Sequence, residues 1–165
     1  FLFNHLLSAQ VDVVGTQKVA MNINGSILKI PYFSNFKLNE TNFDIKSAII
    51  VIHGTNRNAD DYFENMNSAA SMRPKETEST AIIAPQFLRE DDIEFHSLDE
   101  EHLYWSNNGW KSGSNSKDNE ANPRPERIPS YAILDTILER LGQNYPNLES
   151  IVVTGQSAGG QVVNR

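Results

Sequence analysis

The chain has 165 residues, which is enough for one domain. Its net charge of -7 and pI of about 5.0 predict an acidic surface. This charge disfavours contact with phosphate backbones and argues against a nucleic-acid partner. The absence of cysteine excludes disulfides, thiolate catalysis and cysteine-based metal sites. No apolar run is long enough to cross a membrane, and nothing here separates a cytoplasmic from a secreted protein.

The first segment predicts an antiparallel β-hairpin. Val11–Val14 and Val19–Ile23 are rich in β-branched residues, and Asn24-Gly25 then favours a tight turn with positive φ. The residues 26–33 predict the returning strand. Pro31 within it indicates an edge position, because proline cannot donate a ladder hydrogen bond.

Three continuous apolar runs predict strands of a parallel sheet. They are Ala48–Ile52, Thr80–Ala84 and Ile151–Thr154. Such runs are typical of strands that are buried on both faces.

Two segments between these strands predict amphipathic helices. Their apolar faces consist of Tyr62, Phe63, Met66, Ala69 and Ala70, and of Tyr131, Leu134, Ile137, Leu138 and Leu141. Asn58 and Ser130 are the expected N-caps. The first helix should end before Pro74 and the second near Gly142. The alternation predicts an α/β fold whose mostly parallel sheet is covered by helices on both faces.

A long insertion or loop region, residues 86–129, interrupts this alternation. Tyr104, Trp105 and Trp110 favour an ordered part, whereas residues 111–127 are expected to be mobile. The three aromatic residues either line the substrate cleft or pack the loop onto the domain body.

The strongest chemical signal is Gly155-Gln156-Ser157-Ala158-Gly159, which matches G-x-S-x-G. An apolar strand leads into it and small residues follow, which is the strand–turn–helix setting of a nucleophile elbow. Glycines on both sides allow the close approach of strand and helix, and the N–H of Ala158 would face the reacting carbonyl oxygen. The alternative is a glycine-rich turn without chemistry.

His53-Gly54-Thr55-Asn56 follows the first parallel strand and is a second candidate site element. A loop here supplies a further N–H to a developing oxyanion, from Thr55 and secondarily from Asn56. Gly54 lets the backbone approach the substrate. His53 is interpreted as a brace for the loop rather than as a catalytic base.

These motifs resemble the α/β-hydrolase superfamily. HGTNRNADDYF, YWSNNGW and GQSAGG are similar to a group of esterase-like hydrolases, and the resemblance runs from about Val11 to Arg165. It implies a serine hydrolase in which Ser157 attacks a small-molecule carboxylic ester, without a cofactor or metal. A peptidase or acyltransferase on the same scaffold, or a non-catalytic binding protein, remains an alternative.

The resemblance also implies the chain order Ser, acid, His, and no acidic residue or histidine follows Ser157. We therefore expect that residues 1–165 form a single incomplete domain whose C-terminal part is missing. The acid and the histidine would lie in that missing part, which a second fragment could supply as a partner. An apolar edge at 151–154 would then lack its neighbour. Residues 1–9 are interpreted as a strand or arm rather than the tail of a targeting segment.

The histidines present are His5, His53, His96 and His102. Two of them lie beside an acidic cluster, which consists of Asp91, Asp92, Glu94, Asp99, Glu100 and Glu101. A reordered triad is possible in principle, because triads are defined by geometry. The cluster is interpreted as a solvated loop rather than a metal site.

Overall fold

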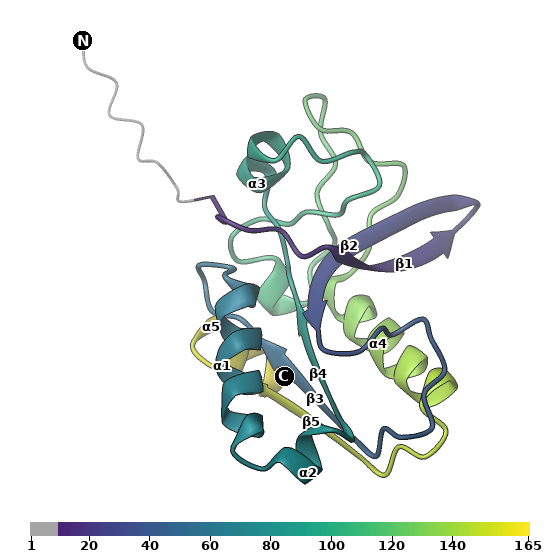
Figure 1. The fold of residues 1–165 in the computed structure, drawn as a ribbon. Coiled ribbons are helices and arrows are strands. Elements are labelled where there is room, and N and C mark those ends of the chain that lie inside the picture. The colour runs from purple at the N-terminus through teal and green to yellow at the C-terminus, as the bar shows by residue number, and fades with distance from the viewer. Residues whose placement is uncertain (1–9) are drawn as a thin grey trace.

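The computed structural model describes residues 10–165, which form an α/β fold on one five-stranded mixed sheet of order β1-β2-β4-β3-β5 (Figure 1). The strands are β1 (Gln17–Ile23), β2 (Ser26–Ser34), β3 (Ser47–Ile52), β4 (Thr80–Pro85) and β5 (Ser150–Gly155). The helices are α1 (Ala59–Ser71), α2 (Pro74–Thr77), α3 (Glu90–Phe95), α4 (Ser130–Asn144) and α5 (Ala158–Val163), with a 3-10 turn η1 (Trp110–Ser112). The predicted N-terminal arm and His5 lie outside the described residues. No helix within residues 10–165 has the length and apolarity to span a membrane.

The N-terminal hairpin is confirmed, with β1 and β2 antiparallel from Gln17↔Tyr32 to Ile23↔Ser26. Asn24 and Gly25 have φ values of 50° and 89°, which is the positive-φ pair of a tight hairpin turn. The prediction of a strand at Val11–Val14 is wrong. That segment has no regular secondary structure, and its N–H at Val11 bonds to Asp92 Oδ1 instead of to a neighbouring strand.

The prediction that Pro31 marks an edge strand is also wrong, because β2 lies between β1 and β4. The β2–β4 pairing covers only Tyr32–Ser34. The carbonyl of Pro31 accepts a hydrogen bond from the N–H of Gln86, just beyond the end of β4. A strand residue points its N–H and C=O to the same side. The N–H that proline lacks would therefore point toward the chain just beyond the end of β4, where no ladder hydrogen bond is lost.

The sheet is only half parallel. β3 pairs in parallel with β4 and β5, whereas both pairings of β2 are antiparallel. β4 is buried throughout, as predicted. β5 is not, because it is the edge of the described sheet: Ile151, Val152 and Val153 are 40%, 53% and 36% exposed.

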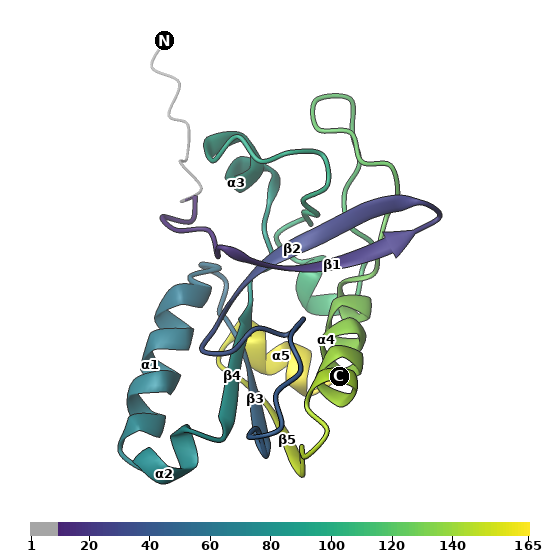
Figure 2. The ribbon, with the colours of Figure 1, turned by 45° about the vertical axis from the view of Figure 1, so that its right-hand side comes forward.

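Helices cover both faces of the sheet. Figure 2 shows α1 on one side of the parallel strands and α4 with α5 on the other. Successive side chains of β3 point to opposite faces of the sheet. Val51 packs with apolar residues of α1, whereas Ile50 and Ile52 belong to the main core. The main core also takes Ile133 of α4, which the predicted helix face omits.

The predicted helix ends need small corrections. Asn58 precedes α1, but its side chain does not cap the helix and instead donates to Asp61. Its φ of -75° and ψ of 65° are those of an inverse γ-turn, closed by the bond from Ala59 N–H to the Arg57 carbonyl. Ser130 is the first residue of α4 rather than its cap, and donates to the Trp110 carbonyl. α4 runs past Gly142 to Asn144, whereas α1 ends before Pro74 as predicted.

Two side chains on the predicted faces are exposed although they lie toward the sheet. Ala69 of α1 is exposed and Leu138 of α4 is 37% exposed. Both border cavities beside β5, Ala69 with Thr154 and Leu138 with Val153, so they are exposed because the described sheet ends at this strand.

Residues 86–129 pack against the sheet through side chains in the main core, which include Phe87, Leu103, Trp105, Trp110 and Ile128. Ser116 is buried and exchanges two hydrogen bonds with Ile128, one through its backbone and one through its hydroxyl. Arg124 is 7% exposed and donates to the His102 carbonyl. These bonds tie parts of residues 111–127 to the domain body where the polar composition offers few apolar contacts, and the expected mobility of this segment stays a prediction.

Candidate active site

Ser157 occupies a sharp turn between β5 and α5. Its φ of 57° and ψ of -116° lie in a region that side-chain-bearing residues rarely adopt. Gly159 N–H donates to the Gln156 carbonyl at 3.0 Å, which closes a turn of type II′ geometry with Ser157 at the position usually held by glycine. Ser157 is exposed.

Glycines make the turn possible. A Cβ on Gly155 would lie 2.5 Å from the carbonyl carbon of Gly159, and a Cβ on Gly159 would lie 2.9 Å from the His53 carbonyl oxygen. A Cβ on Gly54 would lie 2.8 Å from the Tyr62 hydroxyl. Backbone therefore meets backbone at the elbow, and no side chain fits at 155 or 159 without moving the main chain.

The loop after β3 adjoins the elbow because Ile52 and Gly155 are paired at the ends of their parallel strands. The loop forms a turn in which Arg57 N–H donates to the Gly54 carbonyl at 3.1 Å. Thr55 and Asn56, at the centre of this turn, are exposed. Within residues 10–165 no hydrogen bond uses the N–H of Thr55, Asn56 or Ala158. The three predicted donors thus stay available to a ligand.

His53 is fully buried and hydrogen-bonded at both ring nitrogens. Nδ1 donates to the Gly54 carbonyl at 2.8 Å, and Nε2 accepts from the Phe87 N–H at 3.0 Å. Burial lowers the pKa of His53 to about 4, so the ring is neutral at pH 7. These bonds fix the loop and leave no nitrogen for proton transfer, in agreement with a bracing role.

Arg57 and Asp92 are the main elements that sequence reasoning missed. Arg57 Nε donates to Asp92 Oδ2 at 2.8 Å and Nη2 donates to Oδ1 at 3.1 Å, with exposures of 2% and 0% for the two side chains. Burial alone would raise the pKa of Asp92, but bonds from Arg57 and from the N–H groups of Arg89 and Val11 outweigh it and lower the pKa. Nothing in the HGTNRN motif or in the acidic run signals this pairing, since the partners are 35 residues apart.

The rest of the acidic cluster matches the solvated interpretation, with the buried Asp92 as the exception. His102 Nδ1 bonds to Asp99 Oδ1, and His96 Nε2 to the Val11 carbonyl. His102 also forms a β-bridge with Lys29 of β2, a strand that β4 and β3 separate from β5. No group of three acidic or histidine side chains in residues 10–165 is placed to hold a metal ion.

Tyr104, Trp105 and Trp110 are at most 1% exposed. Trp110 stacks on Phe87 with ring centroids 5.5 Å apart, and its ring lies 4.7 Å from that of His53. Both roles considered for these aromatic residues find support: all three pack the loop onto the domain body, and Tyr104 and Trp105 also border a cavity of about 570 Å³ that no residue of the Ser157 turn lines. Through Phe87 and His53 they support the loop behind the candidate site.

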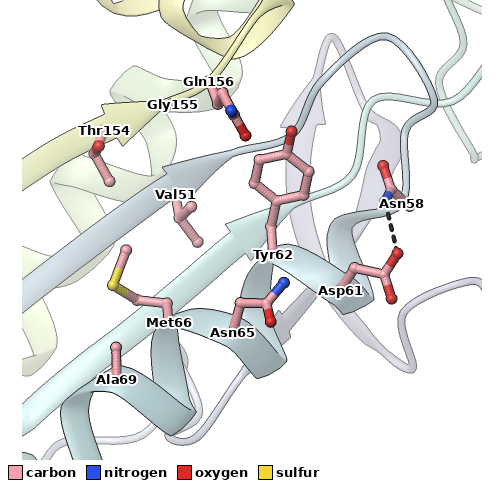
Figure 3. A pocket seen from close by; sticks show the side chains of 10 residues that line it. All are labelled: Val51, Asn58, Asp61, Tyr62, Asn65, Met66, Ala69, Thr154, Gly155 and Gln156. Atoms are coloured by element: carbon pink, nitrogen blue, oxygen red, sulfur yellow. Dashed lines mark hydrogen bonds between the residues drawn. The ribbon is translucent and has the colours of Figure 1, made fainter.

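A cavity of about 530 Å³ opens between α1 and the end of β5, next to the elbow (Figure 3). It is lined by Val51, Asn58, Asp61, Tyr62, Asn65, Met66, Ala69, Thr154, Gly155 and Gln156. Tyr62 extends from α1 toward the end of β5 that carries Gln156. The lining is mixed in polarity and holds no histidine or cation.

No family model matches the chain, and no curated protein matches it. Among solved structures, it is similar to poly(aspartic acid) hydrolase-1 from Sphingomonas sp. KT-1, with 21% identity and a TM-score of 0.48. The match covers 92% of this chain and 51% of the hydrolase, so the chain spans about half the length of that protein.

Proposed function

We propose that this chain carries the nucleophile of an α/β-hydrolase-type serine hydrolase that acts on carboxylic esters. The observation that carries the proposal is the backbone of Ser157, a non-glycine residue with a φ of 57° and a ψ of -116° on a strand-to-helix turn. Such a conformation costs about 1–3 kcal/mol and persists where function requires it. The turn presents an exposed serine at the end of β5, a parallel strand of the sheet, as a nucleophile elbow does.

The loop after β3 supports the same proposal. A tetrahedral intermediate needs N–H donors aimed at its oxyanion, one from the residue after the nucleophile and one from the loop that leads from the third strand to the first helix. Ala158 and Thr55 occupy these two positions, and neither N–H is used within residues 10–165.

The reaction then follows from these groups. Ser157 Oγ attacks the ester carbonyl while a histidine takes its proton, and the oxyanion is held by Ala158 and Thr55 N–H. Collapse of the intermediate expels the alcohol, protonated by the same histidine, and leaves an acyl-enzyme that water hydrolyses.

The base is not His53, whose two nitrogens are occupied in the core. His96 and His102 are also engaged elsewhere. We propose that the histidine and its acid partner belong to residues outside the described range. No metal or cofactor is required for this chemistry.

The test is turnover of p-nitrophenyl acetate and butyrate by the complete natural protein, compared with Ser157→Ala. Loss of the nucleophile should lower kcat/KM by about 10³-fold or more. Ser150→Ala, at the opposite end of β5, is the matched control and should be unaffected. Retention of activity in Ser157→Ala would reject the proposal, whereas turnover of amides or acyl transfer to alcohols in preference to hydrolysis would favour a peptidase or acyltransferase.

A further inference from the structure

The central peptide of the turn Gly54–Arg57 is held by the side chain of Arg57. Arg57 Nη1 donates to the Thr55 carbonyl at 3.1 Å, and the same guanidinium is fixed by the two bonds to Asp92. Asp92 is itself fixed by the N–H groups of Val11 and Arg89, at 2.9 Å and 2.7 Å. The Thr55 carbonyl is thus tied to the protein interior.

In a planar trans peptide the N–H points opposite to the C=O, and no cis peptide occurs in the described chain. A carbonyl of Thr55 that points inward therefore directs the N–H of Asn56 outward. The preceding peptide is set in the same way, because the Gly54 carbonyl accepts bonds from His53 Nδ1 and Arg57 N–H. His53 thus orients Thr55 N–H, and Arg57 orients Asn56 N–H.

The central peptide of a β-turn can flip when the third residue adopts a positive φ, and asparagine tolerates that conformation better than most residues. Asn56 has a negative φ here. Without the bond from Arg57 to the Thr55 carbonyl, the flipped turn becomes accessible and Asn56 N–H turns away from the site.

We propose that Arg57 and Asp92 are positioning residues that lock this peptide, so that Asn56 N–H serves with Thr55 and Ala158 as an oxyanion donor. The inference rests on the proposed serine hydrolase function. It couples the catalytic loop to α3 of the 86–129 segment, which supplies Asp92.

The test uses Arg57→Lys in the complete natural protein. Lysine keeps the charge but cannot bond both carboxylate oxygens and the Thr55 carbonyl together. Arg124→Lys is the matched control, since Arg124 is also a buried arginine bonded to a carbonyl, but to that of His102. Two measurements are made on folded protein: the ¹H–¹⁵N signals of Asn56 and Thr55, and the rate of Ser157 labelling by a fluorophosphonate.

Arg57→Lys should shift or broaden the Asn56 signal and slow labelling by about ten- to a hundredfold, with reagent affinity unchanged, whereas Arg124→Lys should change neither. An unchanged Asn56 signal in Arg57→Lys overturns the locking role whether or not the protein is active. A changed signal with an unchanged labelling rate overturns the role in the reaction. If the unmodified protein is not labelled at all, the proposed function fails, and the Asn56 signal still decides whether Arg57 holds the loop.

Discussion

The backbone of Gly159 lies directly against the backbone of Ile52. A Cβ on Gly159 would come within 2.8 Å of the Ile52 carbonyl carbon and nearer still to its oxygen. The elbow and the end of β3 are therefore in van der Waals contact through main-chain atoms, and the elbow cannot move without moving the loop that carries His53 and Thr55.

Gly159→Ala should consequently distort the elbow and destabilise the fold by about 1–3 kcal/mol, with loss of Ser157 labelling. Gly160→Ala is the matched control, because a Cβ there comes no closer than 3.4 Å to the Gly155 carbonyl oxygen. Urea denaturation of both variants measures the difference. Equal stability of the two would show that the contact between elbow and β3 is not tight.

Backbone strain at Ser157 predicts an unusual stability order. Ser157→Gly relieves the positive φ and should be more stable than Ser157→Ala by about 1 kcal/mol, even though glycine costs entropy in the unfolded chain. Both variants should be inactive. An alanine variant as stable as the glycine variant in parallel denaturant titrations would indicate that the conformation is not strained.

The buried ion pair between Arg57 and Asp92 predicts a large loss of stability when the Asp92 carboxylate is replaced by an amide. Asp92→Asn leaves Arg57 buried without its counter-ion, and we expect a loss of about 3–5 kcal/mol in the free energy of unfolding. The control is Glu76→Gln, which breaks an exposed pair with Arg73 and should have no measurable effect. If the two substitutions destabilise equally, the Arg57–Asp92 pair is not buried as described.

His53 predicts a pH dependence of stability. Its pKa is about 4 in the folded state because of burial, against 6.5 when exposed, so the unfolded chain binds a proton between these values and the folded chain does not. The contribution is complete above pH 6.5, and about 2 kcal/mol is lost on going from pH 7 to pH 5.

His102 acts in the same direction, because burial lowers its pKa despite the nearby Asp99. The loss between pH 7 and pH 5 should thus persist in part in His102→Gln and shrink in His53→Gln. Denaturation curves at both pH values measure it. A slope that is unchanged in His53→Gln would mean that His53 is not buried in its neutral form.

Local pattern predicted much of the fold. The hairpin turn at Asn24-Gly25, the strands β3 and β4, and the existence of α1 and α4 all depend on residue type and periodicity over short windows, which the sequence displays directly. The sharp turn at Ser157 was predictable for the same reason, since such a turn needs small residues at fixed spacing.

The errors arose where the outcome depends on distant partners. β5 has the apolar composition of a buried strand, but burial depends on neighbours that the described sheet does not place beside it. In the sequence, Asp92 is one member of an acidic run that predicts a solvated loop. Its burial depends on Arg57, which lies 35 residues earlier in the chain and contacts it only in the folded structure. The polar stretch 111–127 contacts its neighbours through hydrogen bonds between side chains and backbone, which have no periodic signature in the sequence.

The most direct measurement of the central claim is the intact mass of the complete natural protein before and after exposure to a fluorophosphonate, followed by peptide mapping. We predict one adduct, on the peptide that contains Ser157, and none in Ser157→Ala. Failure of the folded protein to form an adduct, or an adduct on another residue, would contradict the assignment of Ser157 as an activated nucleophile.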